Sequence, residues 1–140
     1  MDVRDDVVDI LAGFALFADL STPQLESLVD AFGEETYVEG DRVLRQGLTG
    51  SSFYVILDGS ASIRVDGVDR TSLRAGDYFG EISCLLGVPP TADIVARGTL
   101  RCLVLAAQEL EPFLVAHPQV MFRLLQGEAR KLRTTTRWLS

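Results

Sequence analysis

Histidine and cysteine are scarce in this chain of 140 residues. It has one histidine, His117, and two cysteines, Cys84 and Cys102. Two separated cysteines are too few for a disulfide framework or a zinc site, and we interpret them as small buried apolar residues. His117 precedes a proline, so we expect it at the start of a helix or on the surface rather than in a catalytic role. Because no base stands near a nucleophile, the sequence predicts a protein that is not an enzyme and holds no metal or cofactor.

Apolar runs long enough to cross a membrane are also missing. No run approaches the ~20 residues that a spanning helix needs. The N-terminal sequence MDVRDDVVDI is rich in acids where a signal peptide would carry basic residues. We therefore expect a cytoplasmic protein with no membrane partner.

Negative charge dominates, with 20 acidic residues against 13 lysines and arginines and a net charge of −7. From residue 118 onward, five bases face one acid, a balance of +4, which leaves −11 for the rest of the chain. An acidic body repels nucleic acid at long range. No helix-turn-helix pattern follows the last predicted helix, so we expect no DNA-binding element in this chain.

Helices are predicted near the N-terminus. Ser21 followed by Gln24 forms a capping-box signature, and apolar residues recur at helical spacing from Leu25 to Phe32. The segment 3–17 has similar spacing, with Gly13 as a weak point.

Short β-rich runs alternate with glycine turns between residues 35 and 105, at intervals of roughly ten residues. This spacing is typical of a barrel or jelly roll. Residues 52–57 are nearly continuously apolar, which predicts a fully buried strand.

Helical spacing returns after residue 105. A short helix is expected to end at His117, and a longer helix is expected to begin at Pro118, a favourable first-turn residue. The apolar residues of the longer helix are predicted on one face: Met121, Leu124, Leu125 and Leu132. We interpret the chain as one domain, residues 1–140, with N-terminal helices (1–34), a β region (35–105) and C-terminal helices (106–140).

The segment with the most specific signal is RAGDYFGEISCLLGVPPTADIVA, residues 74–96. Gly76 and Asp77 predict a turn, Phe79 a core anchor, and Gly80 and Glu81 the opening of a single helical turn. The free amides at such a start form a natural anion site. Glu81 has the wrong charge to bind a phosphate, but its carboxylate suits a hydrogen bond from a sugar hydroxyl.

This segment, together with EGDRVLRQG and SFYVILDGSASIRV, resembles the cyclic-nucleotide-binding domain family. Bacterial catabolite-activator regulators, protein kinase A regulatory subunits and nucleotide-gated channels share that domain. The resemblance covers nearly the whole chain and implies a mainly β fold, an eight-stranded β-roll or jelly roll (double-stranded β-helix). N-terminal helices, a short cassette helix and C-terminal helices would flank it. The last helix commonly mediates dimerisation in the family; the alternative is that its apolar stripe packs on the β-roll.

The resemblance also implies which residues bind the ligand. Glu81 would hold the ribose 2′-hydroxyl, while the backbone of Gly80, Ile82 and Ser83 approaches the ribose and phosphate. The implied set is Gly80, Glu81, Ile82, Ser83, Thr91 and Ala92. Thr91 has two interpretations. In the family, a threonine at this place is often associated with binding of cGMP rather than cAMP; the alternative is a turn residue after two prolines.

The chain departs from the family pattern at the phosphate. Pro90 replaces the arginine that would pair with it, and Asp93 adds a carboxylate where threonine or serine is common. Removing one partner of a buried charge pair costs ~2–5 kcal/mol. If Asp93 lies within about 5 Å of the phosphate, repulsion adds roughly 3 kcal/mol at an effective dielectric near 20. Either another base fills the gap, with Arg74, Arg97 and Arg101 as candidates, or binding is weak.

Two functions follow from this pattern. The first is a regulatory sensor of cAMP or cGMP whose affinity is weakened by Pro90. The alternative is a degenerate domain that binds no nucleotide and serves protein interaction or dimerisation. Trp138, near the C-terminus, suits either an aromatic lid over a bound base or contact with a partner.

Overall fold

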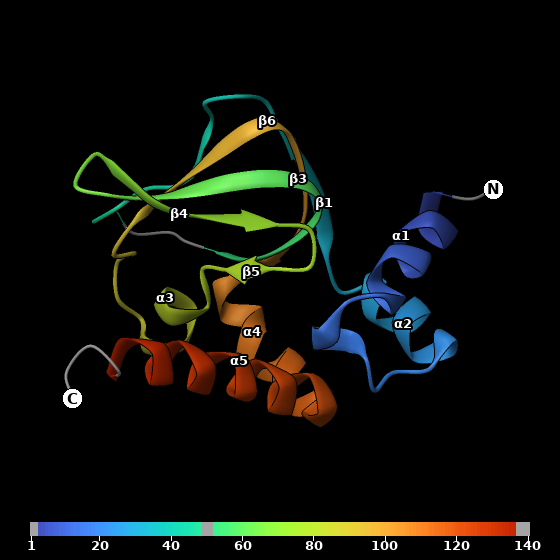
Figure 1. Cartoon of the computed structure of the whole chain (residues 1–140). Helices are drawn as coiled ribbons and strands as arrows, with labels where there is room; N and C mark the ends of the chain where they lie inside the picture. Colours follow the sequence, from blue (N-terminus) through green and yellow to red (C-terminus); the bar gives the residue numbers. More distant parts are fainter. Residues whose placement is uncertain (1–2, 49–51, 137–140) are drawn as a thin grey trace.

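Two long antiparallel strands organise the computed structural model, which describes residues 3–48 and 52–136 of the chain (Figure 1). These strands are β3 and β6, and they pair along nearly their whole length. The shorter strands β1 and β2 pair with β6, whereas β4 and β5 pair with β3, always antiparallel. Their bounds are β1 Gly33–Tyr37, β2 Arg42–Leu44, β3 Ser52–Val65, β4 Val68–Arg74, β5 Tyr78–Phe79 and β6 Asp93–Ala106.

The long strand β3 bends at a glycine. Its register against β6 shifts on both sides of Asp58, next to Gly59, whose φ is +92°. A Cβ at Gly59 would overlap the carbonyl oxygen of Thr99, so the bend requires glycine. Because one continuous strand passes through the bend, the described residues form six strands. The expected count of eight is not confirmed, although the fold is a β-roll with flanking helices.

The first half of β3 is buried on both faces, which confirms the prediction from its continuous apolar run. Phe53, Val55 and Leu57 pack in a core shared with the helices. Tyr54 and Ile56 pack in a second core inside the roll. A strand between two cores has no solvent-facing side, so its sequence shows no alternation.

Three short helical elements lie beside one end of the roll (Figure 1). They are α1 (Val3–Ala12), the 3-10 helix η1 (Ala15–Phe17) and α2 (Thr22–Val29). The predicted capping box is confirmed: the Gln24 amide donates to Ser21 Oγ at 3.4 Å, and the Ser21 amide donates to Gln24 Oε1 at 2.8 Å.

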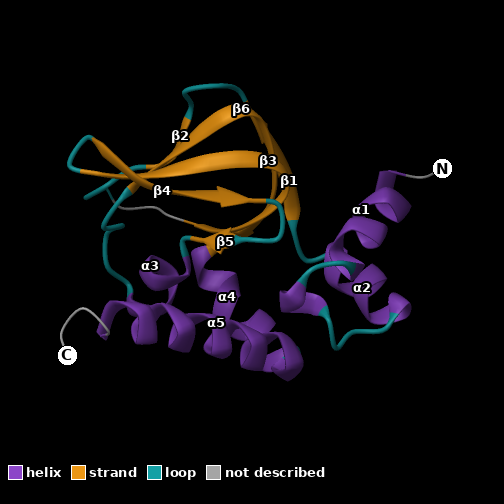
Figure 2. Ribbon diagram, viewed as in Figure 1, coloured by secondary structure: helices purple, strands orange, loops and turns teal. Residues whose placement is uncertain are grey.

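The remaining helices lie together beneath the sheet (Figure 2). They are α3 (Glu81–Leu86), α4 (Ala107–Ala116) and α5 (Pro118–Thr136). As predicted, α5 begins at Pro118.

The predicted apolar face of α5 is only partly buried. Leu124 is buried in the core, but Met121, Leu125 and Leu132 are exposed. Adjacent residues on a helix are about 100° apart, so Leu124 and Leu125 point in different directions. Phe122 is exposed as well, so the exposed large apolar residues of α5 include Met121, Phe122, Leu125 and Leu132.

Candidate functional site

The turn between β5 and α3 requires a glycine. Gly80 has φ +85°, and a Cβ there would overlap the carbonyl oxygen of Ser52 on β3. Phe79, just before it, stacks on Tyr54 with ring centroids 4.7 Å apart. The stacked ring fixes the end of β5, so α3 begins at Glu81 close against β3.

A cavity of about 240 Å³ lies at this turn. All six residues of the predicted ligand-binding set line it, so the structure brings together two segments separated by seven residues in sequence. Small-molecule sites usually measure about 300–1,000 Å³, so this cavity is slightly smaller than that range. The lining also includes Leu44, Ile63, Leu73, Tyr78, Phe79, Pro90, Ile94 and Lys131. The ligand-binding role of the six residues stays a prediction.

Glu81 is the buried charge of the site. Glu81 is only 4% exposed, and Lys131 Nζ on α5 donates to Glu81 Oε1 at 2.9 Å. The same ammonium lies 3.3 Å from Glu128 Oε1. Burial raises the pKa of Glu81, and the Lys131 ammonium opposes this effect. Burial also lowers the pKa of Lys131, but the two carboxylates more than reverse it and leave the pKa raised. The ammonium therefore stays protonated at neutral pH.

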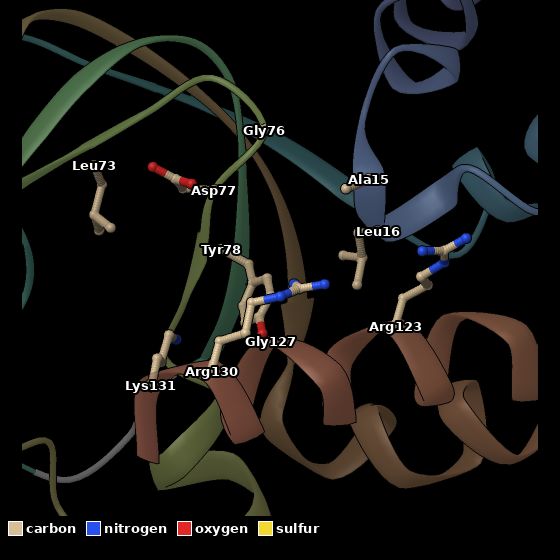
Figure 3. A pocket seen from close by; sticks show the side chains of 10 residues that line it. All are labelled: Ala15, Leu16, Leu73, Gly76, Asp77, Tyr78, Arg123, Gly127, Arg130 and Lys131. Carbon is tan, nitrogen blue, oxygen red and sulfur yellow. The ribbon is translucent and has the colours of Figure 1, made fainter. Parts of the chain in front are cut away.

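Tyr78 docks α5 against the sheet beside this ion pair. Its hydroxyl lies 3.3 Å from both the Leu124 carbonyl oxygen and Glu128 Oε1, and Lys131 Nζ lies 4.6 Å from its ring centroid. A Cβ at Gly127 would overlap the Tyr78 hydroxyl, so the glycine makes room for the ring. Tyr78 and Lys131 also line a neighbouring cavity of about 280 Å³ (Figure 3).

Sequence reasoning missed Lys131, Tyr78 and Gly127 as parts of this site. One signal was present: a glycine in the middle of a 19-residue helix is unfavourable by about 1 kcal/mol relative to alanine. Such a glycine indicates close approach of another group. It does not reveal which group approaches.

Asp93 does not line the cavity. Its Oδ1 accepts a hydrogen bond from the Gln46 amide at 2.7 Å, and the Pro90 carbonyl oxygen accepts one from the Gly47 amide at 2.9 Å. Asp93 therefore holds the turn after β2, and the expected repulsion of a ligand by its carboxylate is not supported. Pro90, in contrast, is buried and lines the cavity.

The three arginines considered as replacement cations lie elsewhere. None of Arg74, Arg97 and Arg101 lines the cavity. Arg97 Nε donates to Ser62 Oγ at 2.9 Å, and its Nη2 lies 2.9 Å from an Asp69 carboxylate oxygen. Arg101 pairs with Glu34 and, at 3.6 Å, with Asp6. Trp138, considered as a lid, lies outside the described residues.

The family model described as "Cyclic nucleotide-binding domain" matches residues 34–117. The chain belongs to the cyclic nucleotide-binding domain family. Domains of this family are regulatory modules and are not themselves catalytic. Among the described residues there is no group of three or more histidine, cysteine or acidic side chains placed to hold a metal. No helix in that part of the chain is both long and apolar enough to span a membrane.

The chain is similar to regulatory proteins from a yeast, a bacterium and a trypanosome. A cAMP-dependent protein kinase regulatory subunit from Debaryomyces hansenii is 36% identical over 93 residues, which cover 66% of this chain and 21% of that protein. The chain thus spans about a fifth of the length of this curated relative.

Two solved structures share the fold at low sequence identity. The catabolite activator protein of Thermus thermophilus has a TM-score of 0.81 at 26% identity, covering 89% of this chain and 61% of that one. A variant regulatory subunit of a cAMP-independent protein kinase A from Trypanosoma brucei, bound to cAMP in its A site, has a TM-score of 0.74. It is 25% identical, covering 89% of this chain and 46% of that one.

Proposed function

We propose that this chain is a sensor of cAMP or cGMP with weak affinity for both. The observation that supports it is the cavity at the β5–α3 turn, where all six predicted residues meet and Glu81 presents a buried carboxylate. Lys131 donates to Oε1 of Glu81, and a carboxylate has further acceptor positions that can take a ribose hydroxyl.

Weak affinity follows from Pro90. A proline side chain cannot donate a hydrogen bond or carry charge, so a phosphate in this cavity lacks the partner that the family places there. The loss of ~2–5 kcal/mol corresponds to roughly 30- to 4,000-fold weaker binding. The Trypanosoma variant that carries cAMP includes an introduced arginine among its three substitutions, which is in keeping with the importance of such a cation.

Calorimetric titration with cAMP and cGMP tests the proposal. We expect the natural chain to bind one of them measurably at millimolar ligand, Glu81→Ala to lose that binding, and Glu109→Ala to keep it. Glu109 is the matched control because it is an exposed carboxylate on α4, away from the cavity. Circular dichroism establishes that each variant is folded. Absence of a heat signal at about 10 mM of either nucleotide would contradict the proposal, because the binding free energy would then be weaker than about 3 kcal/mol.

Restoring the cation gives a second test. Pro90→Arg should raise affinity by about tenfold or more, since each 1.4 kcal/mol is tenfold. Arginine keeps the carbonyl oxygen that the Gly47 amide needs, and Asp93 is left in place because it holds the neighbouring turn. Unchanged affinity would show that position 90 does not face the phosphate.

A second candidate function is assembly without nucleotide, through α5. Phe122 and Leu125 are 58% and 61% exposed, and with Leu132 they stand at spacings of three and seven residues, which occur along a coiled-coil seam. Large exposed apolar groups on one helix favour a partner helix, here a second copy of α5. Sedimentation equilibrium should show a dimer that Leu125→Glu converts to a monomer, while Gln119→Glu leaves the dimer intact. A monomeric natural chain would contradict this function.

A further inference from the structure

The cavity has one cationic side chain among the described residues. Of the side chains that line it, only Glu81 and Lys131 carry charge. Lys131 reaches the cavity from α5, 50 residues along the chain from Glu81. Pro90 and Thr91, at the place where the cassette arginine is missing, line the same space. A single cavity of about 240 Å³ therefore contains the cation, the carboxylate and the cassette segment.

Lys131 retains capacity to bind a ligand. An ammonium has three N–H donors, and among the described residues Nζ donates to two oxygens, one on Glu81 and one on Glu128. The side chain is 53% exposed, so its remaining N–H can be reached from solvent. The Tyr78 ring lies beneath the ammonium, which holds it in place without using an N–H.

The neighbouring helix face is built to keep this lysine in position. Gly127 lies one turn before Lys131 and makes room for Tyr78, whose hydroxyl meets the helix backbone at Leu124. Figure 3 shows Tyr78 pointing from β5 toward Gly127, with Lys131 on the same stretch of helix. The contact that fixes α5 on the sheet therefore also sets the place of the ammonium.

We propose that Lys131 is the cation that this site offers to the phosphate of a cyclic nucleotide, in place of the arginine missing at Pro90. The proposal rests on the proposed function. Glu81 accepts the ribose hydroxyl while its Oε1 holds Lys131, so the ion pair binds a ligand with a hydroxyl and a phosphate without separating. Because Lys131 belongs to α5, that helix contacts the ligand directly and its position responds to occupancy.

The charge of this cluster also explains why the substitute is imperfect. Glu81 and Glu128 carry two negative charges against the single positive charge of Lys131. A phosphate therefore meets a cation whose field is already partly neutralised. Lys131 should consequently support weaker binding than an arginine at position 90.

Titration of the full chain with two probes tests the proposal: cAMP, which carries a phosphate, and adenosine, which does not. Lys131→Met should weaken cAMP binding by about tenfold or more and change adenosine binding by less than about twofold. Lys131→Arg should retain cAMP binding. Arg133→Met removes one positive charge from an exposed site on the same helix and should change neither affinity by more than about twofold. Thermal unfolding of each variant verifies that it is folded.

Equal losses of cAMP and adenosine binding in Lys131→Met would show that Lys131 only positions the Glu81 carboxylate and does not bind the phosphate. That result would overturn the proposal. Unchanged cAMP binding would overturn it as well. Both outcomes leave the sensor function standing, because the natural chain still binds nucleotide. Absence of cAMP and cGMP binding to the natural chain would instead overturn the sensor function and this proposal together.

Discussion

The contact between Gly127 and Tyr78 allows a quantitative test of how α5 is docked. The perturbation is Gly127→Ala, alone and with Tyr78→Phe. In an open helix interior, alanine in place of glycine stabilises by about 1 kcal/mol. Here the added Cβ would overlap the Tyr78 hydroxyl oxygen and lie 3.2 Å from Cζ, inside the ~3.5 Å of favourable carbon contact.

The two effects oppose each other in the natural background. Overpacking of this kind costs about 1–3 kcal/mol. After the helix-propensity gain, Gly127→Ala should lower the free energy of unfolding by about 0–2 kcal/mol. Tyr78→Phe removes the overlapping oxygen and also a hydrogen bond worth about 0.5–1.5 kcal/mol. In that background Gly127→Ala should be neutral or stabilising.

The double-mutant cycle isolates the contact. The four proteins are unfolded in urea and followed by far-ultraviolet circular dichroism. We expect a coupling free energy of about 1–2 kcal/mol between the two positions, well above the ~0.5 kcal/mol within which independent sites add. Gly13→Ala is the matched control because a Cβ there makes only an ordinary contact at 3.6 Å. It should be additive with Tyr78→Phe.

Additivity of Gly127→Ala and Tyr78→Phe would refute the reasoning. So would a full stabilisation of about 1 kcal/mol by Gly127→Ala alone, since both results mean that no group approaches the glycine. The result also bears on ligand binding, because a displaced Tyr78 would move α5 and draw Lys131 away from Glu81.

Further expectations concern the turn, the thiols and the ion pair. Gly80→Ala should lower the urea-derived free energy of unfolding by more than about 2 kcal/mol, because left-handed backbone strain adds to overlap with a β3 carbonyl; a loss below ~0.5 kcal/mol would contradict the turn geometry. Iodoacetamide at about pH 8 should modify Cys84 and spare Cys102 until unfolding, because burial raises the pKa of Cys102 to about 12; two adducts on the native chain by mass spectrometry would refute this. The folded chain binds the Lys131 proton more tightly than the unfolded chain does, because nearby carboxylates outweigh the burial that lowers its pKa, and the net pKa lies above the ordinary 10.5. Between neutral pH and that value the stabilisation is complete, and it disappears as pH rises further through the folded pKa. The difference in unfolding free energy between the natural chain and Lys131→Met should therefore shrink in that alkaline range; a difference that stays constant there would contradict the ion pair with Glu81.

Short-range signals in the sequence determined the elements and the motif. The Ser21 capping box and the helix start at Pro118 depend on neighbouring backbone groups, so a few residues suffice to predict them. Gly80 and Glu81 were identified for the same reason, because the turn and the helix start are local features. That position 90 is a proline is read from the sequence directly, so the prediction that the family's arginine is replaced there needed no structure.

Only the tertiary structure decided which groups meet across the site. Glu81 and Lys131 are 50 residues apart, and their contact depends on how α5 docks on Tyr78. Helical periodicity describes which residues share a face, but the rotation of the helix about its axis is set by packing. That rotation buries Leu124, exposes Leu125 and brings the ammonium to the carboxylate.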